Sequence, residues 1–200
     1  MLVTNGCLQI RRARLTLPGT MPFVLTFSDP TLMDTDIIVG IAHASDLLLQ
    51  GDENTTDAIA HALAERTFPQ IIGTFRPLAA ALFARFSVSD PDATAGEIAN
   101  EITQFSQNVF GNEENTPGGD AIRVAGHLVA SDFTPFDGES DAETIAASPI
   151  HFVVAVAQWI MTMSVILSNL TGDAGGDPIR WAAGTAEDPA PGARVILDPE

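Results

Sequence analysis

The chain of 200 residues has no lysine and no tyrosine, and arginine supplies all nine of its basic residues. Its single cysteine, Cys7, excludes an intramolecular disulfide. Acidic residues outnumber basic ones 26 to 9, for a formal net charge of -17. Direct nucleic-acid binding is disfavoured, because phosphate contacts need a basic surface. The first ten residues show neither a basic start nor an apolar run, so we expect no signal peptide and a cytoplasmic protein.

Short catalytic motifs are also missing. The sequence has no P-loop, no dinucleotide-binding glycine motif, no nucleophile elbow, no H-E-x-x-H and no paired cysteines. These absences weaken the case for a phosphoryl-transfer enzyme, a Rossmann-type oxidoreductase, an esterase or a zinc protease. We expect no cofactor and favour a protein that is not an enzyme, while an enzyme without short motifs stays open.

What is present suffices for one folded domain, since 46% of the residues are apolar and 18% are charged. Residues 8–17 and 22–27 have strand character on either side of a Pro-Gly-Thr turn. They predict a β hairpin or arm within residues 1–30. Arg11, Arg12 and Arg14 make this arm basic. Because a lone hairpin is marginal in water, it must pack on the helices or on another subunit.

After residue 30 the apolar spacing becomes helical. Thr94 with Glu97 fits a capping box, and the apolar face of that helix is expected at Ile98, Ile102, Phe105 and Val109. From residue 173 we expect a loop-rich tail, with a possible short strand at 194–197 beside the arm. The predicted helices cover about 34–50, 55–66, 70–86 (with a kink or new start at Pro77), 94–110, 120–131, 140–147 and 149–170.

The helix predicted at 149–170 has no charged residue, since none lies between Glu143 and Asp173. It is long enough to cross a bilayer. However, it contains several polar side chains and lacks flanking lysine or arginine, which favours a buried central helix over a membrane span. We therefore predict a mainly α, single-domain bundle over residues 31–172, with about six helices around this central one.

One side of that central helix is polar. At 100° per residue, His151, Gln158, Thr162 and Asn169 share a narrow stripe, which we call the polar seam. Either it touches solvent or neighbouring backbone, which is the more common situation, or it lines a ligand pocket or a subunit contact.

A metal site can also be drawn across two predicted helices. His43 with Asp46, and His61 with Glu65, have ligand-like spacings. Such spacings arise often by chance, so surface histidines are the simpler interpretation.

Three functions remain. The first is a non-enzymatic protein–protein interaction or assembly protein, oligomeric with itself or with a protein partner, whose basic arm docks on an acidic surface. The second is a helical small-molecule binder or enzyme with its pocket on the polar seam. The third is an acidic inhibitor that mimics the charge of nucleic acid, although the acids are scattered in short groups.

Overall fold

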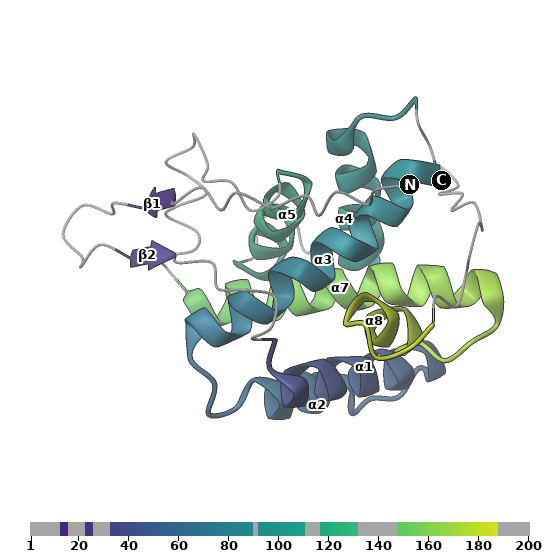
Figure 1. Ribbon diagram of the computed structural model, residues 1–200, viewed down its shortest axis with the longest axis horizontal. Coiled ribbons are helices and arrows are strands. Elements are labelled where there is room, and N and C mark those ends of the chain that lie inside the picture. Colours follow the sequence, from purple (N-terminus) through teal and green to yellow (C-terminus); the bar gives the residue numbers. More distant parts are fainter. Residues whose placement is uncertain are drawn as a thin grey trace, which may run out of the picture.

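Helices dominate the computed structural model, which describes residues 13–15, 23–25, 33–89, 92–110, 117–131 and 148–187 (Figure 1). The predicted mainly α class is confirmed for these residues. Their seven helices are α1 (Thr35–Gln50), α2 (Thr55–Leu63), α3 (Phe68–Ser89), α4 (Ala95–Phe110), α5 (Pro117–Ala130), α7 (Pro149–Thr171) and α8 (Asp177–Ala182).

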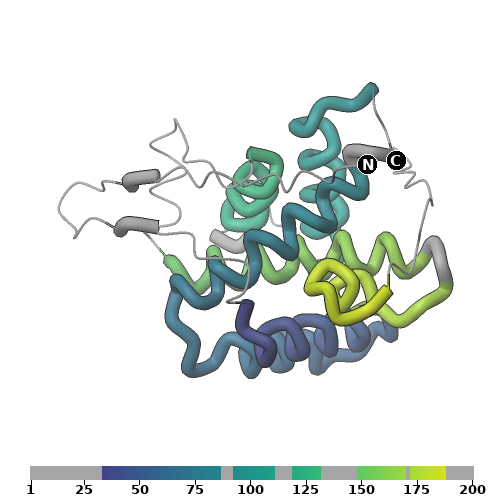
Figure 2. Tube along the Cα trace, viewed as in Figure 1, coloured from purple at the N-terminus to yellow at the C-terminus, as the bar shows by residue number. Residues whose placement is uncertain are grey.

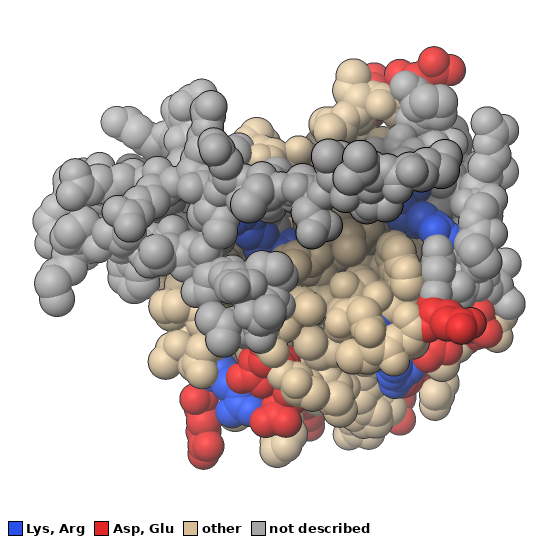
Figure 3. Space-filling view, viewed as in Figure 1, with Lys and Arg blue, Asp and Glu red and all other residues tan. Residues whose placement is uncertain are grey.

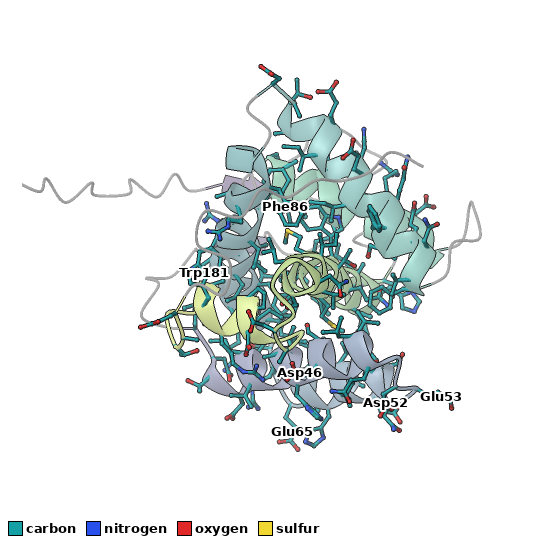
Figure 4. The ribbon with its side chains drawn as sticks, turned by 90° about the vertical axis from the view of Figure 1, so that its right-hand side faces the viewer. Asp46, Asp52, Glu53, Glu65, Phe86 and Trp181 are labelled. Atoms are coloured by element: carbon teal, nitrogen blue, oxygen red, sulfur yellow. The ribbon has the colours of Figure 1, made fainter. Side chains whose placement is uncertain are left out.

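Helix α7 is the centre of the bundle, as predicted. Each of the other six described helices packs against it, and Figure 4 shows them surrounding α7, which is seen nearly end-on. Trp159, Ile160 and Met161 are fully buried. Pro149–Asn169 is long and apolar enough to cross a membrane, and 67% of its most apolar window is buried within the fold. Packing against six helices accounts for that apolar surface.

The ends of α1 and α7 follow the capping signals in the sequence. The Asp34 carboxylate accepts hydrogen bonds from the backbone N–H groups of Asp36 and Ile37, and Gly51 ends α1 in the left-handed region at φ 70°. At α7, the Ser148 hydroxyl accepts from the N–H of His151, and Gly172 at φ 75° ends the helix. Both helices therefore begin and end where local chemistry satisfies their free backbone groups.

Helix α4 has the predicted capping box, but its buried face differs from the expected one. The Thr94 hydroxyl accepts from the N–H of Glu97, and the Glu97 carboxylate accepts from the N–H of Thr94 at 2.7 Å. Ile98 and Ile102 are buried, whereas Phe105 is 37% and Val109 52% exposed. The second half of the prediction was wrong because small side chains, Ala99, Thr103 and Ser106, complete the buried face instead.

Close helix packing explains that shift. The indole N–H of Trp159 on α7 donates to the Thr103 hydroxyl on α4 at 3.2 Å. A Cβ atom on Gly126 of α5 would lie only 2.3 Å from the same hydroxyl oxygen. Three helices meet here, and only a small residue at 126 and a small face on α4 allow it.

Helix α3 and the segment after residue 173 complete the described bundle. The helix predicted at 70–86 is confirmed as α3, which continues through Pro77, so no new helix starts there. After residue 173, where the sequence predicts a loop-rich tail, the structure has helix α8, and Ile179 of α8 is completely buried. The trace in Figure 2 brings this late helix beside α1, the first helix of the bundle.

Of the N-terminal arm, the described part is two short backbone segments. Strands β1 (Ala13–Leu15) and β2 (Phe23–Leu25) pair antiparallel, with Arg14 opposite Val24. The rest of the predicted arm, the helix at 140–147 and the strand at 194–197 lie outside the described residues. These three elements stay predictions.

Candidate functional site

The most strongly charged part of the described chain is the pair α1–α2. We call residues 33–66 the acidic hairpin. It contains seven acids and one arginine, Arg66, a net charge of -6. Red side chains gather along the lower margin of Figure 3, where α1 and α2 lie. The acids are Asp34, Asp36, Asp46, Asp52, Glu53, Asp57 and Glu65.

A glycine brings the two helices of the acidic hairpin together. A Cβ atom on Gly40 of α1 would lie 2.4 Å from the Cβ of Ala62 on α2. Non-bonded carbon atoms essentially never approach so closely, so the backbones can pack in this way only because residue 40 has no side chain. This contact holds the two acidic helices side by side.

Arg66 neutralises only one end of the acidic hairpin. Its guanidinium lies 2.8 Å from the Asp34 carboxylate and 2.6 Å from that of Asp36. Four further acids have no ion pair within the described residues, and three of them are labelled in Figure 4 at the outer edge of the molecule, away from α7. These four are Asp52, Glu53, Asp57 and Glu65.

The four residues of the predicted metal site do not come together. His43 and His61 are both exposed. Among the described residues, no three His, Cys, Asp or Glu side chains are grouped closely enough to hold a metal ion. The physical reason is that the Asp46 carboxylate binds α8 instead of facing the histidines.

Asp46 holds α8 through two hydrogen bonds. Its carboxylate accepts from the backbone N–H of Gly176 at 2.7 Å and from the Arg180 guanidinium at 2.7 Å. A second carboxylate, that of Asp177, lies 2.6 Å from the same guanidinium. Partial burial disfavours the charge on Arg180, but the bonds to Asp46 and Asp177 outweigh it and raise the pKa of Arg180. Arg180 is therefore held as a cation between two acids.

The turn before α8 lies directly on the backbone of α1. A Cβ atom on Gly175 would meet the Ser45 carbonyl oxygen at 2.2 Å, and one on Gly176 would meet that of Ala42 at 2.3 Å. From α7, the buried Ser164 hydroxyl donates to the Gly175 carbonyl. We call this contact, formed by Asp46, Arg180 and the turn 172–176, the clasp. The paired glycines followed by Pro178 were the available sequence signal for it.

The polar seam lies mostly on the outer side of α7. His151 and Asn169 are exposed, and Gln158 is half-buried. Thr162 is 3% exposed, and its hydroxyl donates to the Gln158 carbonyl of the same helix at 2.9 Å. Solvent and the backbone of α7 itself therefore serve as partners for the polar side chains of the seam. A ligand at the seam stays a prediction.

Arg11 and Arg12 lie outside the described residues, and only the backbone of Arg14 is described. Comparison of the chain with protein-family models, curated proteins and solved structures gave no match.

Proposed function

We propose that this chain is a non-enzymatic protein–protein interaction or assembly protein, in which the arm of one subunit docks on the acidic hairpin of the next. One observation carries the proposal: the charge is segregated along the chain. Three of the nine arginines lie within four residues of the arm, whereas residues 33–66 carry a net charge of -6. Complementary charge of this kind speeds association and selects the partner.

Charge alone gives little affinity, since exposed ion pairs contribute about 0–1 kcal/mol each. The acidic hairpin also offers apolar surface. Val39 on α1 is 62% exposed, and the arm sequence has leucine and isoleucine on both sides of its arginines. When the arm docks, its apolar side chains are buried together with its charges. The β hairpin of the arm, which is marginal in water by itself, is then stabilised by the helices on which it packs.

Multi-angle light scattering across protein concentration and salt tests the proposal. We expect an oligomer at low salt that dissociates as salt rises, because screening weakens exposed ion pairs. Replacing Arg11, Arg12 and Arg14 together with glutamine should leave a folded monomer. A chain that is monomeric at every concentration and salt would overturn the proposal, as would an oligomer unaffected by the triple replacement.

The same surface supports a second candidate, an inhibitor that mimics nucleic-acid charge. Carboxylates without an ion pair among the described residues, at the outer edge of the acidic hairpin, are what a basic groove would bind. The assembly function is preferred because the chain carries its own basic complement. A strictly monomeric chain that competes with DNA for a basic DNA-binding protein, in a salt-sensitive manner, would favour the second candidate instead.

A further inference from the structure

Residues 173–183, which form the turn after α7 and helix α8, lie on the outside of the bundle. We call them the strap. Figure 4 shows α8 at the surface between α3 and α1, and the strap packs against α1, α3 and α7. Of the six residues of α8, only Pro178 and Ile179 are buried. A helix of this length is not stable alone in water, so α8 depends on these contacts to stay folded.

The polar contacts of the strap lie where water can replace them. The Arg180 guanidinium and the carboxylates of Asp46 and Asp177 are all partly exposed, and exposed ion pairs contribute little to stability. When the strap leaves, the Gly176 N–H and the Ser164 hydroxyl, which are bonded within the clasp, also come into contact with water. Opening therefore gives these groups water as a partner and costs mainly the burial of a few apolar side chains.

Helix α7 ends before the strap and does not need it. Its last turn is closed by Gly172, whose N–H donates to the Ser168 carbonyl with Gly172 at φ 75°. Gly172, Asp173 and Ala174 are exposed, and glycine turns freely in this region of backbone conformation. Helix α7 also packs against α1, α3, α4 and α5. The bundle therefore keeps most of its core when the strap is open.

From this pattern of contacts, we propose that the strap opens as one unit, hinged at Gly172, while the other six described helices stay folded. When closed, it lies on the backbone of α1 and covers the fully buried hydroxyls of Ser164 and Ser168 on α7. When open, it exposes these hydroxyls to water together with the Asp46 carboxylate. The strap is thus a lid over a polar surface shared by α1 and α7. This inference does not depend on the assembly function.

Native-state hydrogen exchange of the full chain at low denaturant concentrations tests the opening. The amides of Gly176, Arg180 and Ala183 are hydrogen-bonded when the strap is closed. We expect all three to share one opening constant, at least about a hundredfold larger than that of the α7 amides at 159–163. It should depend little on denaturant, because opening exposes little surface. Opening constants equal to those of α7, or three unrelated constants, would overturn the proposal.

A matched pair of substitutions provides a second test. Ile179 on α8 and Ile160 on α7 are both completely buried, so aspartate at either position places a charge where water does not reach. Ile179→Asp should hold the strap open, so that its three amides lose protection while the α7 amides remain protected. Ile160→Asp should unfold the whole bundle. Loss of the whole fold in Ile179→Asp would overturn the proposal, as would strap amides that stay fully protected in that variant.

Discussion

Helices α7 and α8 are both part of the core, yet they are held there by different forces. Along α7, large apolar side chains such as Trp159 and Met161 pack against six other helices. Helix α8 has six residues, and Ile179 is its main apolar contribution to the core. The other contacts that hold α8 belong to the clasp. They are the hydrogen bonds to the Asp46 carboxylate and the glycine backbone that lies on α1.

The difference shows that a helix can be held in the core either by apolar burial or by specific polar and backbone contacts. Apolar burial needs no exact partner, so α7 tolerates moderate change wherever volume is kept. The clasp depends on individual atoms at fixed positions, so one added methyl group or one lost charge acts directly on it. Substitutions in α7 and in the clasp should therefore differ in how much they destabilise the protein and in which kinds of replacement destabilise it.

The largest effect is expected in α7. Replacing Trp159 with alanine removes a fully buried indole and its bond to Thr103, and should lower the free energy of unfolding by about 3–5 kcal/mol. Chemical denaturation measures this loss. Trp181→Ala on α8 is the control, because Trp181 is partly exposed and should cost less. If the full truncation fails to fold, Trp159→Phe keeps most of the volume. An equal or larger loss for Trp181→Ala would contradict the central position of α7.

The second effect tests the clasp backbone. Gly176→Ala places a methyl group against the Ala42 carbonyl of α1, and should destabilise the protein by about 1–3 kcal/mol. The matched variant is Gly73→Ala on α3, where a Cβ atom meets nothing described within 4 Å. There alanine should stabilise the helix by about 0.5–1 kcal/mol. Opposite signs in thermal melts support the close approach, and a neutral Gly176→Ala would refute it.

A smaller effect is expected from the clasp charge. Asp46→Asn removes a partly exposed ion pair with Arg180 but keeps an acceptor for the Gly176 N–H, so we expect a loss of about 1 kcal/mol. Asp36→Asn is the control, because the Asp36 side chain is 81% exposed in its pair with Arg66. A double-mutant cycle with Arg180→Gln isolates the pair. Zero coupling would show that the backbone contacts alone hold α8.

The smallest effect lies outside both regions, at the α4 capping box. The hydrogen bonds from Thr94 hold the pKa of Glu97 below its ordinary value of 4.5. This contribution to stability is therefore present above pH 4.5 and is lost as the pH falls through the lowered value in the folded state. Thr94→Ala should move the pKa of Glu97 back up, as carboxyl NMR titration measures. An unchanged titration would disprove the cap as its cause.

Much of the fold was predictable, and the residues show why. Ser148, Pro149 and Gly172 mark the ends of α7 through chemistry within a single turn, and the absence of charge in between marks its burial. The buried face of α4 was harder to predict. The spacing of Phe105 and Val109 indicates amphipathicity, but which arc of the helix is buried depends on Trp159 and Gly126 in other helices.

The candidate site was less predictable for the same reason. The acids of the hairpin are visible in the sequence, but whether Asp46 faces His43 or α8 depends on residues 130 and more positions away. The sequence allowed a metal site to be drawn because the spacing of possible ligands within each helix is visible in it. The hydrogen-bond donors from other elements that compete for each carboxylate are not. Gly176 and Arg180 compete for Asp46, and they leave the histidines without it.

Local chemistry and hydrophobic patterning, which act within a few residues, were enough to determine the helical class, most helix ends and the central position of α7. Contacts between distant segments decided the rest: the buried face of α4 and the docking of α8 on α1. Those outcomes depend on which backbones can approach and which polar groups find partners, and only the assembled bundle brings these groups within reach of one another.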